Sequence, residues 1–366
     1  MIPVNRPLIH SADINLVSDQ LSDGWVSSES KIVRAFEDRF AALHNTTYAL
    51  AVSNGTAAID VAVALLGIGT DDEVIISTFT IISCVSEVLK RGATPVFLDC
   101  ESDFNVKAES VISAVTAKTK AVIIPHIYGL GSDIENIYNF CKSRGIVVIE
   151  DNAQAIGQVV AGSVVGKFCD ISVYSFYPNK HITTGEGGML CTQSSDFYER
   201  AVFFHNLCFN QTSRFVHEEL GWNYRMTAMQ AALGYSQLDK LNEHVEHKVG
   251  LAELYNQGLQ GDKLILPDQK NQVSDNWYWA YPVLCKDATE LARLKEVLSN
   301  HNIGSRPMFY PLHLQPVLKS HNFSGDQNPS RALDIYERGL YLPIGAGIKR
   351  TEVSTVISVI QDYYYD

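Results

Sequence analysis

The sequence lacks the features that would associate it with a membrane or with nucleic acid. No apolar run reaches the roughly 20 residues that a membrane-spanning helix needs, and the N-terminus shows no charged start followed by an apolar stretch, as a signal peptide would. Basic residues are outnumbered, since 29 Lys and Arg stand against 41 Asp and Glu, for a net charge of −12. We therefore expect a cytoplasmic protein with neither a nucleic-acid nor a membrane partner, in which a locally positive pocket can still bind an anionic substrate.

The cysteine pattern excludes a disulfide framework. The seven cysteines are dispersed and form no CxxC pair. An odd, scattered set in a chain without an export signal predicts free thiols. His244 and His247 are three residues apart, but no cysteine lies near them, and an exposed helix face explains this pair better than a zinc site. We expect no metal ion.

Length and pattern predict two domains of the α/β class. The 366 residues exceed one typical domain. Between residues 73 and 192, strand-like runs alternate with helical patterns, which is typical of a mostly parallel sheet with helices on both faces. We expect a large domain at 1–245, beginning with an N-terminal arm, and a smaller, proline-rich α+β domain at 246–366. The strand-like runs lie at 73–77, 94–98, 120–125, 146–149, 171–176 and 189–192.

Three polar groups follow strand-like runs. The turn Ser53–Thr56 separates the run Tyr48–Val52 from an apolar helix, an arrangement that presents free backbone N–H groups to a phosphate. Asp151 follows the run at 146–149, and Lys180 lies between two apolar runs. A capped helix, a capping acid and an exposed lysine would each be an ordinary explanation alone. Ligands of such sheets, however, bind beyond the carboxyl ends of the strands, where the three groups would meet.

An amine, an acid and a phosphate-binding turn are the groups that pyridoxal phosphate requires. A lysine in a partly dry pocket has a lowered pKa, so its amine can form a Schiff base with the cofactor. A carboxylate keeps the pyridine nitrogen protonated, which lets the ring withdraw electrons from a carbanion on the substrate. The pattern therefore predicts this cofactor, with Lys180 and Asp151 as the catalytic pair. Further hydroxyl and amide groups are available at Ser175, Asn179 and Gln154.

Five segments carry a resemblance to a known family. Together and in order, they resemble the DegT/DnrJ/EryC1/StrS aminotransferases, which act on keto-sugars. The resemblance implies fold type I of the pyridoxal phosphate enzymes, which is aspartate aminotransferase-like, and a homodimer with shared active sites. It also implies L-glutamate as donor and a nucleotide-linked 4-keto-6-deoxyhexose as acceptor, giving a deoxyamino sugar for lipopolysaccharide O-antigen or another cell-surface polysaccharide. The segments read AVSNGTAA, VIEDNAQAIG, SFYPNKHITTGEGGM, GWNYRMTAMQAALG and SRPMFYPLH.

The resemblance also implies roles for individual residues. Lys180 would carry the Schiff base and move the proton of transamination, and Asp151 would pair with the pyridinium nitrogen. Gln154 would lie near the cofactor ring and its 3-hydroxyl group. The remaining cofactor contacts would be Gly55, Thr56 and Ser175 on the phosphate, Asn223 from the other subunit, and Ala57, Ile81 and Asn179.

Three positions depart from the family pattern, and one of them is Ser30, which stands where the family usually has Gly. Ile81 stands where an aromatic residue usually covers the cofactor ring, and His181 follows Lys180 where Thr or Ile is commoner. We interpret His181 as a packing or hydrogen-bonding residue, and we expect the stretch 206–219 to determine substrate selectivity. Arg306 is the favoured substrate-side residue, because a guanidinium suits a phosphate or carboxylate. The full set of substrate-side candidates is His126, Tyr128, His181, Arg214, Arg306, Tyr310 and His313.

Other functions remain open on the sequence alone. A keto-sugar acid of the 8-oxo octulosonate type is an alternative acceptor. A sugar 3-dehydratase of the family would have His in place of Lys180, and a non-catalytic regulator would be expected to lose Lys180 or Asp151. A nucleotide-dependent oxidoreductase would need GxGxxG after its first strand, whereas Gly67-Ile-Gly69 precedes a strand and lacks the third glycine.

Overall fold

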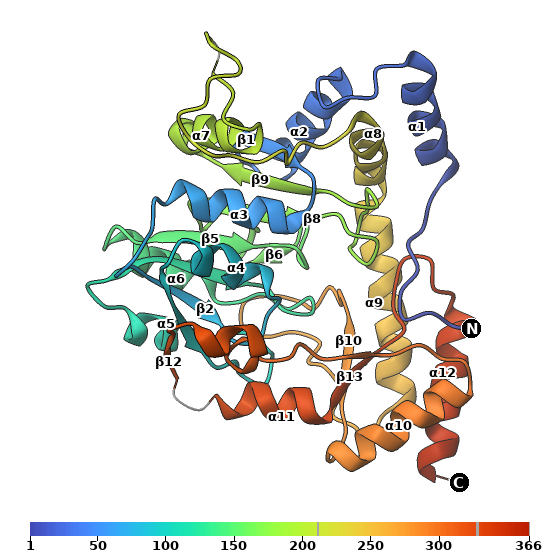
Figure 1. Cartoon of the computed structure of the whole chain (residues 1–366). Coiled ribbons are helices and arrows are strands. Elements are labelled where there is room, and N and C mark those ends of the chain that lie inside the picture. Colours follow the sequence, from blue (N-terminus) through green and yellow to red (C-terminus); the bar gives the residue numbers. More distant parts are fainter. Residues whose placement is uncertain (211, 327–328, 366) are drawn as a thin grey trace.

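A large sheet forms the centre of the molecule (Figure 1). The structure is a computed structural model that describes residues 1–210, 212–326 and 329–365. Strand β9 runs antiparallel to both of its neighbours, whereas the other strands pair in parallel, which confirms the mostly parallel sheet. Within the described residues, the order across this eight-stranded sheet is β1 (Tyr48–Val52), β9 (Gly188–Thr192), β8 (Ile171–Ser175), β5 (Val147–Asp151), β4 (Thr119–Pro125), β2 (Glu73–Ser77), β3 (Thr94–Leu98) and β12 (Ser324–Gly325).

Helices cover both faces of this sheet. Alternate residues of a strand point to opposite faces, so Val122 and Ile124 of β4 pack in one core and Ile123 packs in the other. Burial on both faces explains why these strands read as continuous apolar runs, and the predicted runs match the observed strands to within two residues at each end. Helices α2 (Lys31–Leu43), α5 (Ala108–Ala114) and α6 (Ile134–Lys142) contribute to the first core, and α3 (Gly55–Leu65), α4 (Ser83–Lys90) and α7 (Ser195–His205) to the second.

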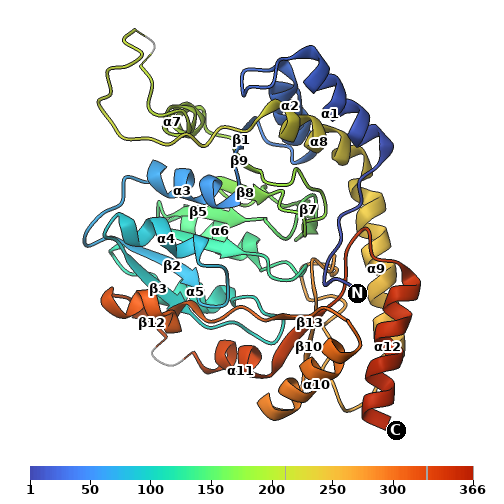
Figure 2. The same ribbon diagram turned by 45° about the vertical axis from the view of Figure 1, so that its right-hand side comes forward.

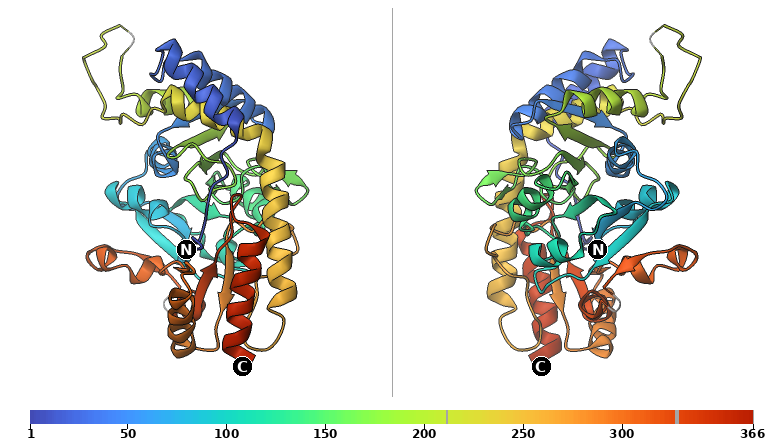
Figure 3. Two further views of the ribbon diagram at one scale, coloured as in Figure 1. Left: turned by 90° about the vertical axis from the view of Figure 1, so that its right-hand side faces the viewer. Right: turned by 90° about the vertical axis from the view of Figure 1, so that its left-hand side faces the viewer.

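A smaller antiparallel sheet lies beside the large one (Figure 2). Its core includes residues from the long helix α9 (Leu241–Gly258), which continues from beside the central sheet to the small one. The predicted boundary between residues 245 and 246 falls inside this helix. Helices α9 and α12 lie side by side (Figure 3). The elements of this part are β10 (Tyr281–Leu284), β13 (Gly339–Leu342), β11 (Arg306–Pro307), α10 (Ala288–Asn300), α11 (Ser330–Arg338) and α12 (Arg350–Tyr365).

The N-terminal residues join the two parts. Ile2 pairs with Ile303, and Arg6 forms an ion pair of 3.0 Å with Glu352. The chain then forms α1 (Ser11–Asp23), which packs on α8 (Ala228–Gln237). Of the α1 residues, Asp13 alone is buried. The predicted arm did not include this helix, although Ile14, Val17 and Leu21 follow a helical spacing in the sequence.

The remaining elements are short. They are β6 (Val159–Val160), β7 (Ser163–Val164) and the 3₁₀ turns Leu238–Lys240, Leu312–Leu314 and Pro316–Ser320. No helix in the described part of the chain combines the length and the apolar character needed to cross a bilayer.

Candidate active site

A cavity of about 550 Å³ opens at the carboxyl ends of the parallel strands. The turn before α3 lines one side, through residues that include Gly55 and Thr56. Asp151 at the end of β5 and Lys180 in the loop after β8 line it as well. The three groups that the sequence analysis expected to meet therefore border one cavity.

The turn into α3 is shaped to hold an anion. The side chain of Asn54 caps the helix by accepting a 2.8 Å hydrogen bond from the N–H of Ala57. A Cβ atom at Gly55 would lie 2.8 Å from Cβ of Ser175, so glycine lets the end of β8 approach the first turn of α3. The hydroxyls of Thr56 and Ser83 are 2.7 Å apart at the same place. Free N–H groups at a helix start, together with hydroxyl groups, form a phosphate site.

Asp151 provides a buried negative charge on the cavity wall. It is only 4% exposed. Its carboxylate accepts hydrogen bonds from the N–H of Ala153 at 3.0 Å and from Sγ of Cys84 at 3.4 Å. Burial and the charge of Asp151 raise the pKa of the Cys84 thiol well above its usual value, so Cys84 serves as a neutral donor. No motif marks the position of Cys84 in α4, so its contact with Asp151 could not be predicted from the sequence.

Lys180 is the amine of this cavity. Burial lowers its pKa to about 8, although the charge of Asp151 acts in the opposite direction. About one molecule in ten then carries a neutral amine at pH 7, far more than for an exposed lysine. Its Nζ lies 4.5 Å from the centroid of the Trp279 ring, within the range of a cation–π contact. The geometry therefore suits a nucleophile that is only partly protonated.

The other predicted cofactor residues also border the cavity, with one exception. Gln154 is fixed by a 2.8 Å hydrogen bond from the N–H of Tyr128 to its Oε1. Oδ1 of Asn179 is buried without a hydrogen-bond partner among the described residues. Ile81 lines the cavity and is 47% exposed. Asn223 does not line it but pairs with Asn206, so its predicted contact would have to be made across a subunit interface. Ala57 and Ser175 complete the predicted residues on the wall.

Two substrate-side candidates lie beneath the cavity rather than on its wall. His126 is fully buried, where its Nδ1 accepts a hydrogen bond from the N–H of Ser132 and its Nε2 donates to Glu150 at 2.8 Å. Tyr128 is also buried and stacks on Trp279 and Phe309. Neither side chain is accessible in this structure, and their expected contact with substrate stays a prediction.

Four further candidates do not line the cavity. His181 is buried and its Nε2 lies 3.2 Å from the carbonyl of Trp277, in agreement with a packing or hydrogen-bonding interpretation. Arg306 is exposed on β11. Tyr310 packs against Tyr336, and His313 lies 2.7 Å from the hydroxyl of Thr78. The structure therefore does not bring these residues to the predicted site within one chain.

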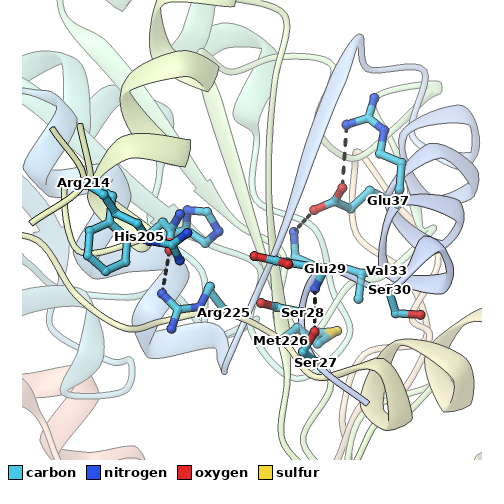
Figure 4. A pocket seen from close by; sticks show the side chains of 14 residues that line it. Ser27, Ser28, Glu29, Ser30, Val33, Glu37, His205, Arg214, Arg225 and Met226 are labelled. Atoms are coloured by element: carbon cyan, nitrogen blue, oxygen red, sulfur yellow. Dashed lines mark hydrogen bonds and ion pairs between the residues drawn. The ribbon is translucent and has the colours of Figure 1, made fainter. Parts of the chain in front are cut away.

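Arg214 borders a different cavity of about 500 Å³ (Figure 4). Arg214, His205 and Arg225 lie on one side of this cavity, opposite Glu29 and Glu37. Burial is the main cause that raises the pKa of Glu37 to about 7 and lowers the pKa of His205. The expected selectivity segment at 206–219 thus contributes Arg214 to a cavity separate from Lys180.

Several residues of the wall around Lys180 were not predicted from the sequence. Tyr224 lies within a segment that carried the family resemblance, so a signal for it existed. The same holds for Tyr177, Glu186 and Phe309. Trp279 and Tyr341 had no such signal, because they reach the cavity only through the packing of the small sheet. The missed residues are Ser83, Tyr177, Glu186, Tyr224, Trp279, Phe309 and Tyr341.

Comparison with known proteins identifies the family of enzymes to which this site belongs. The sequence model of the DegT/DnrJ/EryC1/StrS aminotransferase family matches residues 7–361. The chain belongs to this family. It is 34% identical over 366 residues to GDP-perosamine synthase of Escherichia coli O157:H7, covering 100% of this chain and 99% of that one. Identity to GDP-perosamine synthase of Vibrio cholerae is 35% over 371 residues, with 100% and 99% coverage.

A solved structure shows the same fold. The aminotransferase TlmJ from Streptoalloteichus hindustanus is 29% identical and superposes with a TM-score of 0.91 over 99% of this chain and 98% of that one. The fold predicted from the sequence is thereby confirmed. The chain is an aminotransferase of the transferase class, and pyridoxal phosphate is its cofactor.

The described residues fit this cofactor. The buried carboxylate of Asp151 suits a cationic ring nitrogen, and the unpaired Oδ1 of Asn179 offers an acceptor. The absence of a Cβ at Gly55 lets Ser175 approach the start of α3, where its hydroxyl and the free N–H groups of the helix can hold a phosphate. Lys180 supplies the amine.

The lowered pKa of Lys180 predicts the pH dependence of cofactor capture. Raising the pH through about 8 removes the proton from Nζ, so the rate at which protein without cofactor captures pyridoxal phosphate should rise and then level off. Stopped-flow absorbance measures this rate. Asp151→Asn should move the midpoint lower, because the charge of Asp151 raises the pKa of Lys180. A midpoint at the ordinary lysine value of 10.5 would contradict the burial argument.

Gly55→Ala should weaken binding of pyridoxal phosphate. The added Cβ would lie 2.8 Å from Cβ of Ser175 and force the turn or the strand end to move, for an expected loss of about tenfold or more in affinity. Titration monitored by absorbance gives the dissociation constant. Gly69→Ala is the matched control, since the nearest atom to its Cβ would be 3.9 Å away. Equal affinities of the two variants would show that the phosphate-binding turn does not depend on Gly55.

Proposed function

We propose that the chain transfers an amino group from L-glutamate to a nucleotide-linked 4-keto-6-deoxyhexose, as its similarity to GDP-perosamine synthases suggests. The observation that carries this proposal is the meeting of Lys180 and Asp151 in one cavity beside the phosphate-binding turn. Identity of 34% and 35% to two such enzymes over the whole chain supports the sugar substrate. The product would be a deoxyamino sugar for a cell-surface polysaccharide such as the lipopolysaccharide O-antigen.

Each residue has a task in this reaction. Bound pyridoxal phosphate supplies the electron sink that stabilises negative charge at the substrate carbon. Asp151 would hold the positive charge of the ring nitrogen, and the first turn of α3, with Ser175, would hold the phosphate. Nζ of Lys180 would remove a proton from the amino-bearing carbon of the donor. In the second half of the reaction, it would deliver a proton to the acceptor carbon that becomes aminated. Trp279 and Tyr341, which also line the cavity, would limit the access of water.

We also propose a cytoplasmic homodimer with shared active sites. Phe215 and Leu220 are 80% and 92% exposed on a loop that extends from the body (Figure 2), and Trp25 is 56% exposed. Apolar side chains of this size are better accommodated at an interface. A partner covering this region would support the predicted role of Asn223. All seven cysteines are free and buried, which suits a reducing compartment.

A keto-sugar acid is the second candidate acceptor. Ile81, which is 47% exposed at the cavity, is the observation that favours it, because an aliphatic residue stands where perosamine synthases are expected to have an aromatic one. Retention of Lys180 favours amino transfer over sugar 3-dehydration.

Lys180→Ala should abolish the half-reaction with glutamate. The purified wild-type protein should be yellow from bound cofactor and lose this colour when glutamate is added, with release of 2-oxoglutarate. The variant loses the group that moves the proton, so its rate should fall by roughly 10²- to 10⁴-fold or more. Lys167→Ala changes an exposed lysine and serves as control. A colourless wild-type protein that is unaffected by added cofactor would refute the proposed function.

A panel of acceptors identifies the sugar. The proposal predicts that GDP-4-keto-6-deoxymannose is aminated fastest, when compared with UDP- and dTDP-linked keto-sugars and one keto-sugar acid in the presence of glutamate. Mass spectrometry of the products reports each exchange of a carbonyl oxygen for an amine. Turnover confined to the sugar acid would replace the nucleotide-sugar proposal with the second candidate.

A further inference from the structure

A fully buried lysine, Lys248, lies near the catalytic amine and is separated from it by Trp279. It is 1% exposed on α9, and its Nζ donates a 3.0 Å hydrogen bond to the main-chain carbonyl of Trp279. Trp279 in turn presents its ring to Nζ of Lys180 at 4.5 Å. The reaction described above assigns no task to Lys248.

Apart from the hydrogen bond to Trp279, the environment of Lys248 does not require an amine. Within the described residues, no carboxylate forms an ion pair with it. Burial, followed by the charge of Lys180, lowers its pKa to about 7. A methionine would fill similar space without the cost of removing an amine from water. What the amine adds is the hydrogen bond to Trp279.

The position of the Trp279 ring depends on its main chain and on stacking. Its indole Nε1 is buried and has no hydrogen-bond partner in the part of the chain that the structure describes. Tyr128 stacks on the ring with a centroid distance of 5.8 Å and an interplanar angle of 4°. Because no bond of its own side chain fixes the indole, the bond from Lys248 to the carbonyl is the polar contact that holds residue 279 in place.

We propose that Lys248 is a positioning residue for Lys180: it anchors the carbonyl of Trp279, and the anchored indole face holds Nζ of Lys180 where it can reach the cofactor aldehyde. The proposal rests on the use of pyridoxal phosphate at Lys180. Capture joins Nζ to the aldehyde carbon in a C=N bond, and the aldehyde oxygen leaves as water, without oxidation or reduction. Lys248 takes no part in these bonds and acts through Trp279 alone.

Lys248→Met tests this role with two ligands. Protein without cofactor is mixed with pyridoxal phosphate, whose capture needs a positioned Lys180, or with pyridoxamine phosphate, which binds without forming a bond to lysine. The variant should capture pyridoxal phosphate about fivefold more slowly, the equivalent of one buried hydrogen bond. Its affinity for pyridoxamine phosphate should stay within about twofold of wild type, because the phosphate and ring contacts are intact.

Tyr255→Phe is the matched control. Tyr255 is fully buried on the same helix, and its hydroxyl donates a 2.9 Å hydrogen bond to the carbonyl of Pro343. The variant therefore loses a bond of the same kind, from the same helix, but not to Trp279. Its capture rate and its affinity for pyridoxamine phosphate should both match wild type.

The outcomes separate this proposal from the proposed function. A wild-type protein that binds neither ligand refutes the use of the cofactor. If the wild type binds both, then capture by Lys248→Met at the wild-type rate, or an equal loss for both ligands, overturns the role of Lys248. If circular dichroism shows Lys248→Met to be unfolded, Trp279→Leu decides. The proposal is supported if Trp279→Leu lowers the capture rate of pyridoxal phosphate by a larger factor than the affinity for pyridoxamine phosphate. It is overturned if the two fall by the same factor.

Discussion

The site depends on keeping one amine largely out of water. Burial lowers the pKa of Lys180 to about 8, while the buried charge of Asp151 limits the decrease. Either influence alone would give the amine a different pKa. A buried lysine without the acid would hold its proton more weakly, and an exposed lysine would be almost fully charged at neutral pH. The central sheet supplies the acid, and Trp279 and Tyr341, from the part of the chain beyond α9, line the same cavity.

A parallel sheet brings these groups together by its topology. Strands β5 and β8 are hydrogen-bonded neighbours that run in the same direction, so Asp151 and the loop that carries Lys180 emerge at one edge. Strand β1 lies two places further along and joins the sheet through the antiparallel β9. Its end delivers the turn to α3 at the same edge, where glycine at position 55 allows the close approach to Ser175.

This topology also explains how far the sequence could predict the site. Lys180, Asp151 and Gly55 each follow a strand, so their meeting was accessible from the strand pattern. His126 and Tyr128 also follow a strand, but the sequence does not determine the direction of a side chain beyond a strand end. Hydrogen bonds to Ser132 and Glu150 hold His126 in the core. Trp279 was not predictable, because its approach depends on long-range docking of the small sheet.

The continuity of α9 has an evolutionary consequence. One uninterrupted helix runs from the edge of the large sheet to the core of the small one. Inserting or deleting one residue in a helix rotates everything beyond it by about 100° and shifts it by about 1.5 Å. Such a change would misalign Lys248, Tyr255 and the sheet that carries the aromatic wall in one step. The length of α9 should therefore be far less tolerant of change than its exposed residues, and substrate range can diversify through loops only while this length is preserved.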